Sequence, residues 1–225
     1  MRHQLATVCL LIFGFISNAQ TANQILFRSV RQFEQVNDFK SKLEVDFQLP
    51  SINIQKMEGK VFYRKPDKYK VKLTGVAFLP KQNPFALFQI LKDSSKYLAV
   101  MGERSLIRKV NCYSIQVIPQ NDPDLVLAKL WIEVNTGVVM KSEMTTKTAG
   151  TVISSYQYGN QKKYALPDKI AFQVDMRTFK LPKMIAVDLN NKRKDTNENA
   201  SAVGKIEFTF SEYSINKGVA DIDVK

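Results

Sequence analysis

The amino-acid sequence predicts a mainly β protein with few helices, built from about ten or eleven short antiparallel strands. The main observation is a strict alternation of apolar and polar residues, which is typical of a strand with one buried face. The alternation places Ala128, Leu130, Ile132 and Val134 on one face, and later Ile170, Phe172, Val174 and Met176. Turn residues at 135–137 and strands at 138–146 and 151–158 connect the two segments. Together they form a meander with one apolar face.

This apolar face must be covered, and the strand pattern allows two ways to cover it. Two sheets packed face to face would bury it, and so would one strongly curved sheet that holds helices in its hollow. The number of strands does not distinguish the two architectures.

The segments around the meander indicate the same class. A helix is predicted to start at Thr21, because Thr21 and Gln24 have the spacing of a capping box and an apolar stripe follows. Further strands are predicted at 42–49, 52–54, 59–64, 69–74, 97–101, 106–110, 112–118 and 205–214, with a turn at Gly102–Glu103. The polar stretch 190–201 is predicted to be an exposed loop.

Residues 75–91 interrupt the series of strands. Asn83 followed by Pro84 predicts the start of a short helix. That helix is apolar on nearly every side, through Phe85, Leu87, Phe88, Ile90 and Leu91. It is therefore either a plug of the core or a lid that moves over an apolar cavity.

The N-terminus has the pattern of a signal peptide. A short basic start is followed by an apolar run from Leu5 to Ile16, which is too short to span a bilayer, and by small residues at 17–19. We expect cleavage before Gln20 and a single exported domain at 20–225. A lipid anchor on Cys9 is the weaker interpretation, because Val8 stands where a small residue is required. The rest of the chain has no apolar run of spanning length, so we expect no stable membrane span.

Cleavage would remove most of the reactive chemistry. His3 is the only histidine and Cys9 is one of two cysteines, so the mature chain would keep no imidazole and only Cys112, which we expect to be a small packed residue. The carboxylates of Glu133, Glu143 and Asp175 fall on the polar face of their strands. We therefore expect no catalysis, no cofactor and no metal site.

The charge is strongly basic. The 33 Lys and Arg residues against 21 Asp and Glu give +12, or +11 without Arg2. Such a charge favours anionic partners, and nucleic acid is not expected because no binding motif is present. The alternating Lys68, Lys70 and Lys72 are interpreted as a solvated sheet face.

Several segments, taken in order, are similar to the LolA-like outer-membrane lipoprotein-sorting family. Gly59 to Val71 resembles the family segment in which a strand ends at a basic pair and a proline before the next strand begins. The other similar segments are Gly102–Glu103, Asn111–Tyr113, Leu130–Glu133, Thr136–Gly137, Leu166–Ile170 and Phe210–Val219. Each motif is weak alone, but together they span nearly the whole mature chain.

The resemblance implies an incomplete, strongly curved antiparallel barrel of about eleven strands, with helices covering an apolar hollow. It also implies a monomeric periplasmic carrier that takes acylated lipoproteins, or another lipid, to the outer membrane. An inner-membrane release complex and an outer-membrane acceptor would be its partners. Burying an acyl chain is favourable by about 0.8 kcal/mol per methylene, so such a hollow needs no reactive group.

The candidate cavity wall consists of the residues with inward parity, which are either plain core or ligand contacts. They are Leu43, Val45, Phe47, Val61, Tyr63, Tyr69, Val71, Leu130, Ile132, Met140, Ile170, Phe172 and Val174, with Phe85, Phe88 and Leu91 as the lid. Arg64 and Lys65 form the basic turn that the resemblance links to lid control. The family pair ends in arginine, and lysine lacks its planar set of donors, so lid control at Lys65 is open.

Two alternatives to a lipoprotein carrier remain from the sequence. The first is a carrier of another lipid or hydrophobic metabolite. The second is a ligand-free interaction or sensor protein of the same fold, which bulky side chains filling the hollow would favour.

Overall fold

The computed structural model describes residues 20–50, 52–74, 86–148, 150–175, 203–220 and 223. The predicted signal peptide, the start of the helix at 83–85 and the loop at 190–201 lie outside these residues and stay predictions. Among the described residues no helix is both long enough and apolar enough to cross a bilayer.

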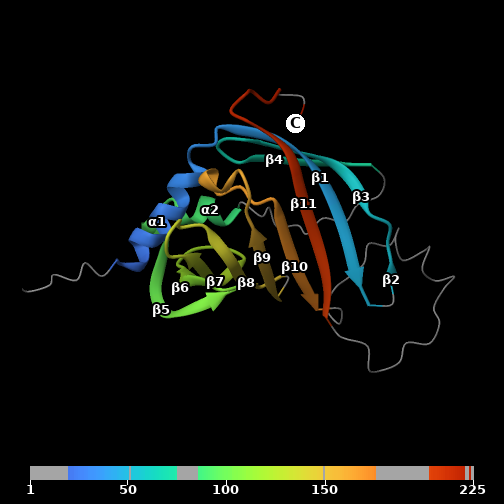
Figure 1. Cartoon of the computed structure of the whole chain (residues 1–225). Helices are drawn as coiled ribbons and strands as arrows, with labels where there is room; N and C mark the ends of the chain where they lie inside the picture. The colour runs from blue at the N-terminus through green and yellow to red at the C-terminus, as the bar shows by residue number, and fades with distance from the viewer. Residues whose placement is uncertain are drawn as a thin grey trace, which may run out of the picture.

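One antiparallel sheet contains all the described strands (Figure 1). These are β1 (Asp38–Leu49), β2 (Ile52–Asn53), β3 (Met57–Arg64), β4 (Lys68–Leu73), β5 (Tyr97–Ile107), β6 (Val110–Pro119), β7 (Leu125–Glu133), β8 (Val139–Thr146), β9 (Gly150–Gln157), β10 (Lys169–Asp175) and β11 (Val203–Ile215). Their order is β4–β3–β1–β11–β10–β9–β8–β7–β6–β5, with β2 paired to β1. The end strands β4 and β5 do not pair with each other, so the sheet stays an open, curved half-barrel, as the sequence predicts.

The alternation read from the sequence decides which face of the sheet is buried. In β1 every second residue is buried, and its register with β11 aligns Leu43 with Phe210 and Val45 with Phe208. Both members of each pair are almost inaccessible to solvent. These pairs, together with Leu130 of β7, belong to one continuous core on the concave side of the sheet.

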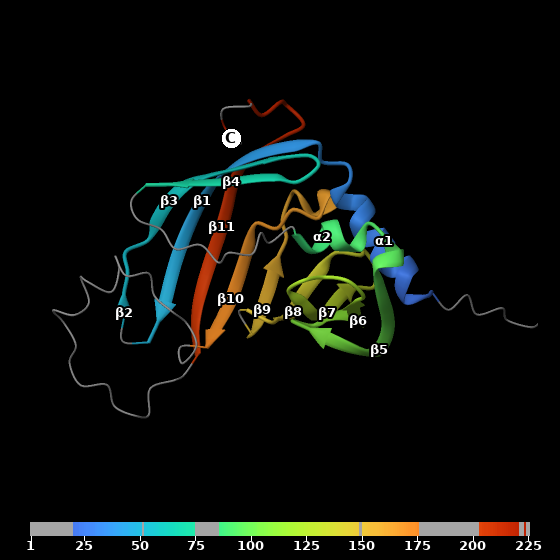
Figure 2. The ribbon, with the colours of Figure 1, turned by 180° about the vertical axis from the view of Figure 1, so that it is seen from behind.

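Two helices lie on this concave side (Figures 1 and 2). They are α1 (Ala22–Phe33) and α2 (Ala86–Leu91), and two short 3-10 turns, η1 (Ser94–Lys96) and η2 (Lys162–Tyr164), lie beside them. The capping box of α1 forms as predicted, because the Thr21 hydroxyl accepts from the Gln24 amide and the Gln24 side chain accepts from the Thr21 amide. The buried stripe of α1 includes Leu26, Val30 and Phe33.

The predicted turn at Gly102–Glu103 is wrong. Strand β5 runs through both residues, and the only disturbance there is a register shift between Met101 and Arg104. The chain reverses instead at Arg108 and Lys109, whose φ angles are 49° and 67°. A two-residue hairpin turn with positive φ at both positions normally uses asparagine and glycine, so this turn has no sequence signature.

Trp131 is a second departure from the pattern. It lies on the convex side of β7, yet it is buried, because the ammonium groups of Lys129 and Lys141 lie 4.9 Å and 4.3 Å from its ring. The lysine stems cover the indole and the charges remain in water.

The position of the β5–β6 turn can be tested by stability. Replacing Arg108 with Asn and Lys109 with Gly relieves two left-handed residues, and we expect it to raise the free energy of unfolding by about 1 kcal/mol. The matched control, Glu103→Gly, places glycine inside a strand and should lower this free energy by roughly 0.5–1 kcal/mol. Urea unfolding measures both changes. If the double variant lowered the free energy of unfolding and Glu103→Gly raised it, the turn would lie at residues 102–103.

Candidate functional site

The predicted cavity-wall residues come together on the concave face. Nine of them are buried, namely Leu43, Val45, Phe47, Val61, Tyr63, Leu130, Ile132, Ile170 and Phe172. Tyr69, Val71 and Met140 are partly exposed and pack against the same core. Of the predicted lid, Phe88 and Leu91 are buried on α2, whereas Phe85 and the side chain of Val174 lie outside the described residues.

Side chains of α2 pack closely against Val139 and Tyr156 of the sheet. A cavity of about 10 Å³ remains between α2 and the sheet, lined by Leu87, Phe88, Val139, Tyr156, Tyr158, Ala165 and Pro167. A space of this size holds about one water molecule, whereas pockets for small ligands occupy roughly 300–1,000 Å³. An acyl chain could enter only if the cover over this space moved.

Tyrosine hydroxyls supply the polar groups of the hollow, and the sequence analysis did not single them out. Tyr156 shares a hydrogen bond of 3.0 Å with Ser142, and Tyr158 donates to the carbonyl of Val139 at 2.7 Å. Tyr213 donates to the carbonyl of Pro167 at 2.7 Å. Burial raises the pKa of all three tyrosines, so these hydroxyls stay neutral. The alternation along β8 and β9 could have placed Ser142 and Tyr156 on the buried face of the sheet.

Helix α1 is fixed to the turn between β7 and β8 by polar side chains. Arg28 donates to the carbonyls of Val134, at 3.1 Å, and Asn135. The Ser29 hydroxyl donates to the carbonyl of Gly137, and the Gln32 amide donates to that of Thr136. Carbonyls of four consecutive residues therefore hold one face of α1, which makes this helix the fixed part of the cover.

Helix α2 is held by a stacked ring and by polar side chains. Its Phe88 ring stacks on Phe33 of α1, with centroids 4.9 Å apart and an interplanar angle of 16°. The Tyr97 hydroxyl donates to the carbonyl of Leu91 at 3.3 Å, and the Gln89 amide donates to the carbonyl of Pro66 in the β3–β4 turn. Leu87, Phe88 and Leu91 of α2 are also buried in the continuous core, so apolar packing joins these polar contacts in holding the helix.

Glu34, at the C-terminal end of α1, joins these parts in a cluster that we call the latch: Glu34, Lys65 and Lys92. The Lys92 ammonium lies 2.8 Å from one carboxylate oxygen of Glu34, and that of Lys65 lies 3.5 Å from the other. Lys65 also donates to the backbone carbonyl of Glu34. Of the predicted basic turn, Lys65 contacts the end of α1, while Arg64 donates to the carbonyl of Val219 at 3.4 Å.

The electrostatics of the latch follow from these contacts. The hydrogen bond from Lys92, with a further contribution from Lys65, lowers the pKa of Glu34 below its ordinary value of 4.5, although partial burial opposes this. Glu34 and Lys92 were not predicted, because they are far apart in the sequence and neither follows a recognisable motif.

The remaining candidate groups include Cys112 and Glu133. Cys112 is fully buried, as expected, and burial raises the pKa of its thiol to about 11, which disfavours the nucleophilic thiolate. Glu133 is bound by Lys162 at 2.7 Å and by the Thr136 hydroxyl at 2.5 Å. Among the described residues no group of three His, Cys, Asp or Glu side chains is placed to hold a metal ion.

Comparison with known proteins identifies the fold. No family model matches the chain, and no curated protein matches its sequence. A LolA superfamily protein from Nitrosomonas europaea superposes with a TM-score of 0.56 at 12% identity, over 92% of this chain and 99% of that one. A DUF1329 family protein from Desulfovibrio piger gives 0.57 at 9% identity, over 92% and 98% of the chains.

A third structure, a putative outer-membrane lipoprotein-sorting protein domain from Vibrio parahaemolyticus, gives a TM-score of 0.52 at 11% identity, over 91% of this chain and 96% of that domain. At such low identities the likeness concerns the fold alone. The chain has the LolA-like half-barrel fold, which the sequence motifs predicted.

The latch can be tested with Glu34→Gln, which removes the charge and keeps the shape. Because the side chains of the latch are partly exposed, we expect the free energy of unfolding at neutral pH to fall by at most about 1 kcal/mol, and amide exchange in α2 to accelerate. The control Glu212→Gln removes the ion pair with Lys42, which is more exposed, and should leave α2 unchanged.

The pH dependence of this effect has a definite sign. The pKa of Glu34 is lowered by folding, so its contribution is complete above 4.5 and disappears as the pH falls through the lowered value. The stability difference between the native protein and Glu34→Gln should therefore vanish in acid. A difference that stays constant down to pH values below that point would contradict an ionic latch.

Proposed function

We propose that this protein is a periplasmic carrier that sequesters the acyl chains of lipoproteins for transfer to the outer membrane. The observation that carries the proposal is the apolar concave face lying under a separate short helix, α2, that polar side chains hold in place. The fold shared with a lipoprotein-sorting domain supports it. The chemistry needed is burial and release, so we propose that no catalysis is involved.

In this proposal the described position of α2 is the closed position of the carrier. An apolar hollow exposed to water is unfavourable, so α2 would cover it until cargo arrives. Displacing α2 would separate Phe88 and Leu87 from the sheet and expose the concave surface at Tyr156 and Tyr158. Each methylene that enters then contributes about 0.8 kcal/mol toward binding.

The proposed function also includes export to the periplasm, two membrane partners and a lipid cargo. The predicted signal peptide would deliver the chain to the periplasm as a single domain. There it would act as a monomer between an inner-membrane release complex and an outer-membrane acceptor. Another lipid or hydrophobic metabolite is the alternative cargo.

A second candidate function is a ligand-free interaction protein. The close packing of α2 on the sheet favours it, because the space of about 10 Å³ between them leaves no room there for an acyl chain unless α2 moves. In that case α2 would be part of the core.

The two candidates are distinguished by what the protein carries. Native mass spectrometry of the gently purified periplasmic protein, followed by lipid extraction, should show a bound acylated peptide or lipid. We also expect uptake of a fluorescent acyl probe. A clean apo mass together with no probe uptake would reject the carrier and leave the interaction protein.

Lys65 offers a graded test of lid control. Lys65→Arg supplies several donors to the C-terminal end of α1 and should slow probe uptake, whereas Lys65→Ala removes the contact and should accelerate it, each by roughly threefold to tenfold. Stopped-flow fluorescence measures the rates. Lys56→Ala, which removes the exposed pair with Glu44, is the control, and equal rates in all variants would show that Lys65 does not hold the lid.

A further inference from the structure

The apolar alternation of β1 is interrupted by one polar residue, Ser41. Its side chain lies on the concave face, between Phe39 and Leu43, and only 3% of the residue is exposed. The Ser41 hydroxyl has no hydrogen-bond partner within the part of the chain that the structure describes. A buried hydroxyl without a partner lowers the stability of the folded protein, so a serine at this position needs an explanation other than stability.

The tyrosine hydroxyls of the same face differ from Ser41 in this respect. Tyr156 shares its hydrogen bond with Ser142. Tyr213 donates to the carbonyl of Pro167. These hydroxyls are therefore used by the fold itself, whereas Ser41 presents a polar atom that the described core does not use.

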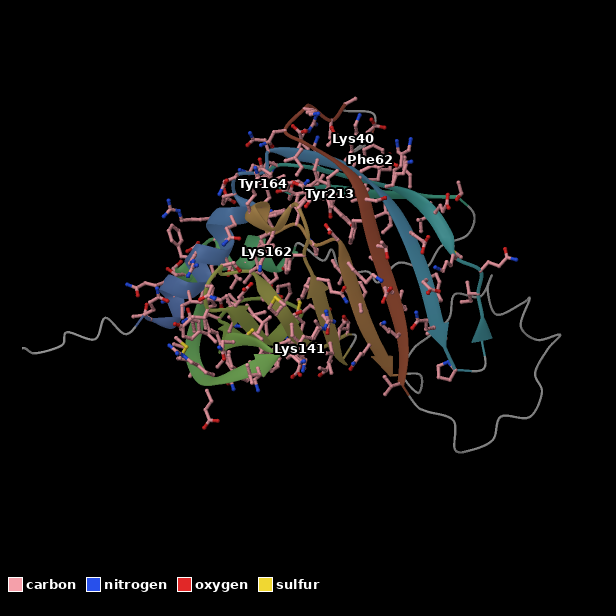
Figure 3. All side chains as sticks on the ribbon, viewed as in Figure 1. Lys40, Phe62, Lys141, Lys162, Tyr164 and Tyr213 are labelled. Atoms are coloured by element: carbon pink, nitrogen blue, oxygen red, sulfur yellow. The ribbon has the colours of Figure 1, made fainter. Side chains whose placement is uncertain are left out.

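The sheet is irregular directly beside Ser41. Strand β11 shifts its register against β1 at this point, so that two residues of β11, Glu212 and Tyr213, lie opposite Ser41 alone. Glu212 has a left-handed backbone, with φ at 52°. Bulges and left-handed residues other than glycine are over-represented next to functional sites. Figure 3 shows Tyr213 and Lys40, which precedes Ser41, at this end of the sheet, away from Lys141.

The surface around Ser41 is apolar and reaches the edge strand β4. The strand register aligns Ser41 with Val61 of β3 and Val71 of β4. Val61 is fully buried, whereas Val71 is partly exposed. Along β1, Leu43 and its partner Phe210 continue the apolar surface. A ligand with an apolar chain and a polar end would therefore meet one unpaired hydroxyl in otherwise apolar surroundings.

We propose that the Ser41 hydroxyl donates a hydrogen bond to the ester carbonyl at the head of a bound acyl chain. A carbonyl oxygen accepts such a bond, and the methylenes beyond it gain from apolar contact. An uncharged carbonyl fits this place better than a carboxylate, because a buried charge needs a charged partner and the neighbours Leu43 and Val61 are apolar. The inference rests on the proposed carrier function and names the group of the cargo that the hollow recognises.

Paired probes that differ in this carbonyl test the inference. Monopalmitoyl glycerol carries an ester, and hexadecyl glycerol carries an ether with a chain of the same length. Displacement of the fluorescent acyl probe measures the affinity of each. The ester-to-ether affinity ratio should fall by about fivefold in Ser41→Ala, which is the effect of one net hydrogen bond. Comparing the ratio between variants cancels the difference in hydrophobicity between the probes.

The stability of the ligand-free protein is a second readout. Because alanine lacks the unpaired hydroxyl, Ser41→Ala should raise the midpoint of urea unfolding. A lower midpoint would show that the hydroxyl already has a partner, such as a buried water, and would overturn the inference.

A matched control removes a buried hydroxyl from the other face of the sheet. Ser114 of β6 is buried and lies opposite Trp131, on the convex side. Ser114→Ala should leave the ester-to-ether ratio unchanged. An equal fall of the ratio in Ser114→Ala and Ser41→Ala would overturn the inference.

The same measurements separate this inference from the carrier function. If both probes bind and the ratio is equal in the native protein and in Ser41→Ala, the inference is wrong and the carrier remains. If neither probe binds, both are wrong. Lipoproteins and phospholipids both carry acyl esters, and a dipalmitoylated cysteine peptide and dipalmitoyl phosphatidylglycerol, used in the same assay, distinguish these sources. Each of them that binds should lose about fivefold in affinity in Ser41→Ala.

Discussion

The apolar concave face of one open sheet is the constraint on which the rest of the structure depends. A closed barrel would bury this face against itself, but β4 and β5 do not meet, so other elements must cover it. Helices α1 and α2 do this from one side. The cover is therefore not a strand-bonded part of the sheet, and it can in principle separate from the sheet while the strand ladder stays intact.

The two helices differ in how firmly they are attached. Helix α1 has a capping box, a buried stripe and side-chain hydrogen bonds to carbonyls of the β7–β8 turn. Helix α2 has six residues, and a helix of that length is not stable without its tertiary contacts. Its position is stabilised by the Phe33–Phe88 stack, by burial of Leu87 and Leu91, and by the latch. The side chains that occupy the space beside the sheet, Leu87 and Phe88, belong to α2 itself. A displacement of α2 would therefore also remove them from that space.

Much of the fold could be predicted from alternation, because a sheet with one buried face requires an apolar residue at every second position of each strand. The buried positions of Leu130 and Ile170 were predicted in this way. The turn at Arg108–Lys109 could not be predicted, since neither residue favours positive φ and Gly102–Glu103 offered a more usual turn sequence. The latch was missed for a different reason: Glu34 and Lys92 meet only in the folded chain.

The choice of lysine at the latch is consistent with a cover that opens. An arginine fork is tied to one geometry, whereas an ammonium is a point charge that exchanges one anion for another with little geometric requirement. Lys65 and Lys92 share a single carboxylate, so removing that one charge breaks both ion pairs and leaves only the hydrogen bond from Lys65 to the backbone carbonyl of Glu34.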